Sequence, residues 1–193
     1  EDPVEKIDPA LNQTQVQPQL DFSFAEGVRA LMRQDPDIIM IGEIRDLETA
    51  EMAVQAALTG HLVFSTLHTN DAPSALTRLM ELGVPAYLLN ATILGVLAQR
   101  LVRTLCPHCK QPDDGASTEL LAEAVKPWKI NSGNWRPYKP VGCVDCRMTG
   151  FRGRTGIYEL LSVTEAFKGL VQHDVGPAPL RKQAVADGMR PLR

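Results

Sequence analysis

Two short apolar runs separated by a helical segment constrain the fold of this chain more than any other feature. The runs Ile38–Ile41 and 62–64 lack the polar alternation of a half-exposed strand, which is typical of strands buried on both faces of a parallel sheet. Between them, the apolar residues of 46–58 recur at the period of an amphipathic helix. Strand, helix and strand within about 30 residues form a βαβ unit. We therefore predict an α/β fold.

Segments on either side of this unit also carry helix signals. Ser23 and Asp71 are suitable N-cap residues, and Gly60 and Gly83 stand where a helix would end. We expect helices over residues 24–34, 46–58, 72–82 and about 85–105, a strand at 157–161, and two short helices after that strand.

The character of the sequence changes after Cys106. Segment 107–150 contains five prolines and both tryptophans, and only 120–125 has the pattern of a helix. We therefore predict three parts. Residues 1–105 form the sheet-bearing core, residues 106–150 form a small irregular module, and residues 151–193 form a C-terminal segment of strand and helices.

The overall composition excludes several classes of protein. The 193 residues are 44% hydrophobic and 22% charged, so the chain can bury a core and is not disordered. Its 20 Lys and Arg against 23 Asp and Glu give a formal net charge of -3, so we expect no nucleic-acid partner. The longest apolar stretch, around 86–105, is interrupted by Asn90, Arg100 and Arg103, so we expect no membrane span.

An acidic residue follows the first predicted strand directly. Glu43 stands just after Ile38–Ile41, and the carboxyl edge of a parallel sheet is where open α/β folds bind ligands. In nucleoside triphosphatases a carboxylate at this place orients Mg²⁺ or polarises the attacking water. The alternative is a solvated acid beside Arg45 and Asp46, and Glu43 alone does not decide between the two.

Two histidines bracket the second predicted strand. His61 precedes it and His68 follows it, so the two lie at opposite ends and at most one reaches the chemistry of the carboxyl edge. We favour His68, as a hydrogen-bond partner of a γ-phosphate or as a conformational sensor. The alternative is a hydrogen-bonded structural histidine.

Four cysteines fall in two pairs, each with two residues between its members. The pairs are Cys106 with Cys109 and Cys143 with Cys146. This spacing lets both thiolates of a pair reach one ion from one turn, so we predict a structural Cys₄ Zn²⁺ site with His108 outside it. The alternatives are two disulfides or four free thiols.

Several longer motifs carry a family resemblance. Segments 33–37, 42–46, 60–70, 99–106 and 149–154, together with the four cysteines, resemble those of the secretion ATPases that drive type II secretion and type IV pilus assembly. The resemblance implies a RecA-like P-loop NTPase core with an inserted zinc module and C-terminal helices. It favours the type II secretion branch through segment 95–103, with pilus assembly as the alternative.

The resemblance also implies roles for individual residues. Segment 1–5 matches the end of the family's Asp box, 38–43 its Walker B motif with Gly42 where an aspartate is usual, and 60–70 its His box. It implies that Glu43 polarises water and that Glu1 and Glu5 lie near Mg²⁺ or the γ-phosphate. We add His61 and Arg45 to His68 as candidate nucleotide-site residues.

One motif of the family is absent. No Gly-Lys pair occurs in the 193 residues, so the chain lacks the phosphate-binding loop G-x-x-x-x-G-K-[ST] that cradles ATP. We expect that loop upstream of Glu1 in a longer protein, a C-terminal helix beyond Arg193, and no ATP hydrolysis by this chain alone.

The intact protein is expected, by the resemblance, to bind ATP and Mg²⁺ as a homo-hexamer. It would act in the cytoplasm at the bacterial inner membrane, against platform proteins of the secretion or pilus machinery. Arg147, Arg152 and Arg154 form a basic cluster that is either a solvated surface or a contact for a partner or anionic lipid. From a different class, a non-catalytic interaction module stabilised by zinc would also explain the cysteines.

Overall fold

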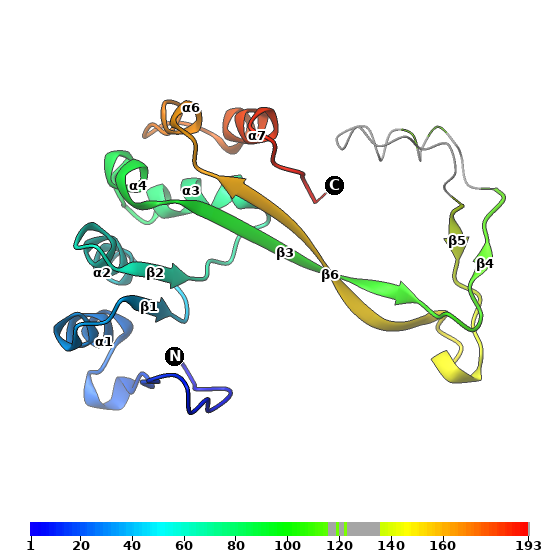
Figure 1. The fold of residues 1–193 in the computed structure, drawn as a ribbon, viewed down its shortest axis with the longest axis horizontal. Helices are drawn as coiled ribbons and strands as arrows, with labels where there is room; N and C mark the ends of the chain where they lie inside the picture. Colours follow the sequence, from blue (N-terminus) through cyan, green and yellow to red (C-terminus); the bar gives the residue numbers. More distant parts are fainter. Residues whose placement is uncertain (116–118, 120–121, 123–135, 193) are drawn as a thin grey trace. The chain divides into compact units, whose positions relative to one another are not determined.

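The computed structural model describes residues 1–115, 119, 122 and 136–192. Its helices are α1 (Phe24–Leu31), α2 (Leu47–Leu58), α3 (Ala72–Glu81), α4 (Ala86–Thr92), α6 (Glu165–Lys168) and α7 (Pro177–Ala186). Its strands are β1 (Ile38–Ile41), β2 (Leu62–Ser65), β3 (Gly95–Leu105), β4 (Gln111–Pro112), β5 (Tyr138–Lys139) and β6 (Phe151–Ser162), all shown in Figure 1. The chain forms two compact units, Glu1–Val96 with Ser162–Asp187, and Leu97–Leu161 with Gly188–Arg193.

The predicted βαβ unit is the centre of the first unit. Strands β1 and β2 pair in parallel, with Ile38 opposite Leu62 and Ile41 opposite Ser65. Buried residues of α1, α2 and β1 pack into one core, namely Val28, Ile39, Ile41, Ala53 and Ala56. The prediction of a parallel sheet with an intervening helix is confirmed.

The prediction that these strands are buried on both faces is wrong. Ile39 and Ile41 are 2% exposed, whereas Ile38 is 60% and Met40 is 65% exposed, as the alternation of a strand requires. The helices α1 and α2 pack against the Ile39 face. The continuous apolar run therefore supplies one covered face and one apolar face that is exposed in this chain.

Three helices begin at the residues that the sequence indicated. The side chains of Ser23, Asp46 and Asp71 accept hydrogen bonds from the backbone N–H three residues further on, which satisfies donors that an open helix end leaves free. Beyond the ends of α2 and α3, Gly60 has φ +101° and Gly83 has φ +109°, a conformation that favours glycine.

The long helix expected at about 85–105 is wrong. Only Ala86–Thr92 is helical, and Gly95–Leu105 is the strand β3. Strand β3 pairs with β6, and the two run in opposite directions in Figure 1. Pairing with β6, which begins only at Phe151, overrides the helix propensity of the segment's Leu, Ala, Gln and Arg residues.

The second unit contains β4, β5 and most of β3 and β6. Strands β4 and β5 are antiparallel, with Gln111 opposite Lys139. Glu159 and Leu161 of β6 are buried, and the Leu192 backbone N–H donates to Oε2 of Glu159 over 3.0 Å. The helix expected at 120–125 lies, apart from Ala122, outside the described residues.

Candidate functional site

Glu43 lies at the carboxyl edge of the β1–β2 sheet, as predicted. The loops that follow the two strands are tied together there. Thr66 Oγ1 donates to the Gly42 carbonyl over 2.6 Å, and the Ile44 N–H donates to the Thr66 carbonyl over 3.0 Å. Because of these bonds, Glu43 after β1 and His68 after β2 are held at the same place.

The two carboxylate oxygens of Glu43 have different surroundings. Oε1 accepts a hydrogen bond from Arg45 over 2.5 Å. Oε2 is buried and, among the described residues, has no hydrogen-bond partner, although Nε2 of His68 lies 3.3 Å away. The Arg45 guanidinium holds the pKa of Glu43 below its ordinary value, with burial opposing and His68 adding to the effect. Glu43 is therefore an oriented carboxylate whose Oε2 faces His68 without a hydrogen bond.

The groups around this carboxylate are open to solvent. The Glu43 side chain is 15% exposed, whereas that of Arg45 is 61% and that of His68 is 92% exposed. A buried acceptor without a partner is costly unless water or an ion satisfies it. Oε2 is therefore the atom of this site that still needs a hydrogen-bond donor or a cation.

The N-terminal acids lie at different distances from this edge. The Glu1 backbone lies beside Gly42, because its Cα would be 3.6 Å from a Cβ built on that glycine. The pKa of Arg45 is raised chiefly by Glu43, and the charge of Asp2 adds a smaller contribution. Glu5 is exposed. Asp2 and Thr66 were not among the predicted site residues, although they belong to the segments 1–5 and 60–70.

His61 lies at the other end of β2. Its Nδ1 lies 2.9 Å from the Ala56 carbonyl and 3.0 Å from Thr59 Oγ1, at the C-terminal end of α2. The structure therefore brings Glu1, Glu43, Arg45 and His68 to one edge and places His61 at the opposite one.

The four cysteines form a second candidate site. Their sulfur atoms all lie within 4.8 Å of one another, and none is in a disulfide. The Sγ separations include 3.9 Å for Cys106–Cys143, 3.8 Å for Cys109–Cys146 and 3.7 Å for Cys143–Cys146. A tetrahedral ion with metal–sulfur bonds of about 2.3 Å separates its ligands by about 3.8 Å. The donor set fits a four-coordinate metal ion.

Backbone N–H groups support negative charge on this cluster. The N–H groups of Cys143 and Gly150 donate to Cys146 Sγ over 3.1 and 3.2 Å. Burial alone raises the pKa of the Cys146 thiol, but these bonds outweigh it and lower that pKa to about 6. Gly150 has φ +76°, and a Cβ there would lie 2.5 Å from Pro140 Cβ. His108 lies outside the cluster and pairs with Asp145 over 2.9 Å.

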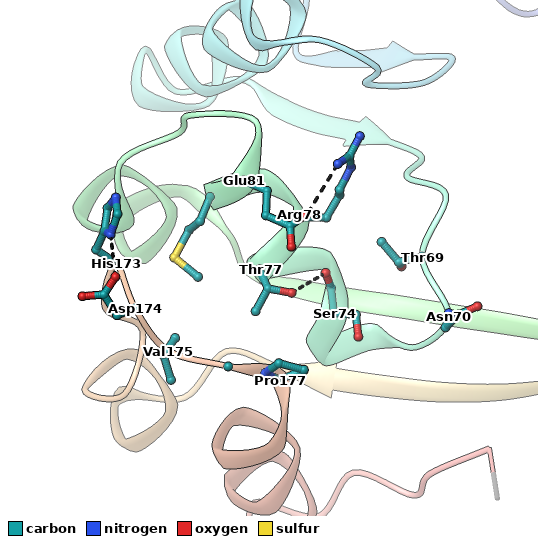
Figure 2. A pocket seen from close by; sticks show the side chains of 12 residues that line it. Thr69, Asn70, Ser74, Thr77, Arg78, Glu81, His173, Asp174, Val175 and Pro177 are labelled. Atoms are coloured by element: carbon teal, nitrogen blue, oxygen red, sulfur yellow. Dashed lines mark hydrogen bonds and ion pairs between the residues drawn. The ribbon is translucent and has the colours of Figure 1, made fainter.

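A pocket of about 580 Å³ adjoins the loop that carries His68. Figure 2 shows its lining, in which Thr69 and Asn70 of that loop and residues of α3 face the segment before α7. Glu43, Arg45 and His68 do not line it. The pocket is thus a neighbour of the Glu43 edge rather than part of it.

Comparison with known proteins assigns the family. The family model of the type II/IV secretion system protein matches residues 1–193. The chain belongs to this family. It is 55% identical over 193 residues to the type IV pilus assembly ATPase TfpB of Acinetobacter baylyi, covering 100% of this chain and 33% of that protein. It is 50% identical over 184 residues to the type II secretion system ATPase E of Vibrio cholerae, covering 94% and 35%.

Solved structures support the fold of this secretion-family chain. The pilus retraction motor PilT with bound ADP matches with a TM-score of 0.61 at 28% identity, over 97% of this chain and 43% of that one. The ATPase DotB of Legionella pneumophila matches with a TM-score of 0.55 at 25% identity, over 87% and 36%. The predicted P-loop ATPase fold class is confirmed. The chain spans about a third of the length of its curated relatives.

Among the described residues, no helix has the length and apolar character that crossing a bilayer requires.

Proposed function

We propose that this chain is part of a hexameric ATPase that powers type II protein secretion by driving pseudopilus assembly at the inner membrane. The observation that carries the proposal is Oε2 of Glu43, which lies without a hydrogen bond beside His68 at the carboxyl edge of a parallel sheet, in a chain of the secretion family. A carboxylate in this setting can accept a hydrogen bond from the water that attacks a γ-phosphate.

The neighbouring side chains supply the remaining roles. Arg45 fixes the orientation of Glu43 through Oε1 and keeps the carboxylate ionised. His68, which is open to solvent at 3.3 Å from Oε2, reports whether a γ-phosphate is present. Glu1, beside Gly42, and the exposed Glu5 contribute negative charge for Mg²⁺. The placement of His61 favours a structural role at the end of α2.

The experiment is a substitution of Glu43 in the full-length protein. Glu43→Gln keeps the shape of the side chain and removes its basicity, so ATP turnover should fall by about 10²- to 10⁴-fold while the Kd for ATP changes little. Glu48→Gln, an acid with a side chain 63% exposed at the start of α2, is the matched control and should keep turnover. An equal loss of binding and turnover in Glu43→Gln would instead make Glu43 structural.

The chain alone is expected to be inactive. It contains no Gly-Lys pair and so no phosphate-binding loop. Phosphate release from the purified 193-residue chain, abolished by Glu43→Gln, would contradict this expectation.

For the cysteine cluster we propose structural Zn²⁺. Four thiolates in a closed set are the typical ligands of a structural zinc ion, which folds small modules that have little apolar core. The residues Cys106, Cys109, Cys143 and Cys146 would hold it. When bound, the ion supplies the crosslink between the two cysteine pairs.

Type IV pilus assembly is the second candidate function. The 55% identity to a pilus assembly ATPase, against 50% to a type II secretion ATPase, favours it. Complementation of deletion strains separates the two, because only the true function should be restored by the gene for the full-length protein.

The basic cluster of Arg147, Arg152 and Arg154 is exposed and suits contact with platform proteins or anionic lipid. Vesicles containing acidic lipid should retain the full-length protein, and Arg152→Gln with Arg154→Gln should weaken that binding. Equal binding to neutral vesicles would contradict the proposed contact of this cluster with anionic lipid.

A further inference from the structure

The carboxylate of Asp71 serves two elements at once. Oδ1 accepts hydrogen bonds from the Ser74 N–H over 2.9 Å and from Ser74 Oγ over 2.6 Å, which caps α3. Oδ2 pairs with the guanidinium of Arg181 on α7. Oδ1 alone completes the cap of α3, so the pair of Oδ2 with Arg181 is not needed for capping. It links two segments that are 110 positions apart.

Helix α7 is docked independently of this ion pair. Its residues Leu180 and Ala184 are buried, and the helix packs against α3 and α6. At its end, Asp187 accepts hydrogen bonds from Thr164 Oγ1 over 2.7 Å and from Gln183 over 2.8 Å. Removing the Arg181 guanidinium therefore releases Asp71 Oδ2 while the apolar contacts of α7 remain.

Asp71 is also the end of the loop that presents His68. At its start this loop is tied to the residues on either side of Glu43 by the two hydrogen bonds of Thr66 with Gly42 and Ile44. At its end, Thr69 Oγ1 donates to the Asp71 carbonyl over 3.2 Å, and the Thr69 N–H donates to the Leu67 carbonyl over 3.1 Å. The position of Asp71 therefore sets the position of the short segment that contains His68.

The pocket in Figure 2 lies between this loop and the segment that leads into α7. Thr69 and Asn70 line one side, and His173 and Pro177 line another. Because the pocket separates the His68 loop from the segment before α7, these two segments cannot fix each other's position by packing across it. The Arg181–Asp71 pair is a direct contact that does so.

The pair is present at neutral pH. Burial alone raises the pKa of Asp71, but the hydrogen bonds from Ser74 and the charge of Arg181 outweigh it and lower that pKa below its ordinary value. The Asp71 side chain is 15% and that of Arg181 is 38% exposed, so water screens this pair less than a fully exposed one.

We propose that Arg181 is a positioning residue for ATP hydrolysis. Through its pair with Asp71, Arg181 positions the loop that places His68 beside Glu43. The proposal rests on the ATPase function proposed above. If Arg181 acts in this way, helix α7 influences the turnover rate although it contributes no atom to the Glu43 edge.

The test compares Arg181→Met with Lys182→Met in the full-length protein. Lys182 is the exposed neighbour on the same helix, so it controls for the loss of a positive charge. Arg181→Met should lower kcat by about three- to tenfold with KM for ATP within about twofold, and Lys182→Met should change neither. Arg181→Lys keeps a positive charge near Oδ2 and should restore part of the rate. A lower melting temperature with wild-type kcat in Arg181→Met would overturn the proposal.

A double-mutant cycle tests the route through His68. If Arg181 acts by placing His68, Arg181→Met should lower kcat little further in a protein that already carries His68→Ala. Equal falls in both backgrounds would overturn that route. Failure of this route is distinguishable from failure of the proposed ATPase function. Turnover by the wild-type protein and its loss in Glu43→Gln test the ATPase function without any change at Arg181.

Discussion

The four cysteines form a closed set of ligands, whereas the Glu43 edge presents Arg45 and His68 to solvent. Cys106 and Cys146 are buried, and the four sulfur atoms lie within 4.8 Å of one another. At the other site His68 is 92% and Arg45 is 61% exposed, and Oε2 of Glu43 lacks a hydrogen-bond partner among the described residues. A closed ligand set suits a structural ion, and an edge with exposed side chains around an acceptor that lacks a hydrogen bond suits a substrate that comes and goes.

The largest expected effect tests the closed site. Removing the metal should unfold the two cysteine turns, because structural zinc contributes on the order of 10 kcal/mol to a small module. Unfolding should stop short of the β1–β2 unit, which has its own apolar core. Metal analysis with thiol-selective release should give about one zinc per chain, and circular dichroism after chelation should retain most of the helix signal.

Two results would break this part of the comparison. Four cysteines oxidised in protein prepared without oxidant would replace the metal site by disulfides. Complete loss of helix signal on chelation would mean that the first unit depends on the cysteine module. Lys168→Met, which breaks an exposed pair with Glu165, is a control and should leave the zinc content unchanged.

The accuracy of the sequence predictions also differs between the regions, for a physical reason. The geometry within each cysteine pair follows from short spacing, since two residues between the thiols fix it locally. The caps at Ser23 and Asp71 were predictable for the same reason. Strand β3 was not, because segment 95–105 has helix formers at helical spacing and becomes a strand only through pairing with β6.

The candidate catalytic edge was predictable in part. The order strand, turn and acid gives the place of Glu43, and the parallel pairing brings His68 to it. The partners of the two Glu43 oxygens and the bond from Thr66 depend on the path of two loops, which no local pattern specifies. The Arg181–Asp71 pair likewise depends on how α7 packs on α3.

The next effect concerns the strand beneath the Glu43 edge. Ile39→Ala should lower the free energy of unfolding of the 193-residue chain by about 2–5 kcal/mol, because it leaves a cavity in the core. Met40→Ala, on the neighbouring residue that is 65% exposed, should change it by less than about 0.5 kcal/mol. Urea unfolding followed by circular dichroism measures both.

This pair of variants sharpens the comparison when it is repeated in the full-length protein. A large cost of Met40→Ala there, together with a small cost in the 193-residue chain, would show that another part of the protein covers this face. A large cost in both would contradict the one-sided burial of β1.

A smaller effect tests the open site. His68→Ala in the full-length protein should reduce the preference for ATP over ADP by roughly tenfold, the value of one hydrogen bond to a charged group. The melting temperature should change little, since the side chain is 92% exposed. His173→Ala, which is 93% exposed and pairs with Asp174, is the matched control. A lower melting temperature with unchanged nucleotide preference would make His68 structural.

The smallest effect concerns the pair that joins the His68 loop to α7. Asp71→Asn keeps a good N-cap residue for α3 but removes the charge that faces Arg181, so it should cost about 0.5–1 kcal/mol at neutral pH. The pKa of Asp71 is lowered in the folded chain from its ordinary 3.8. The stabilisation is therefore fully present above that ordinary value and is lost as pH falls through the lowered one. Wild-type and Asp71→Asn stabilities, measured by urea unfolding from pH 7 downwards, should thus converge below about pH 3.8. A difference that stays constant down to pH 2, or one that grows as pH falls, would mean that the charge of Asp71 does not hold α7 to the loop.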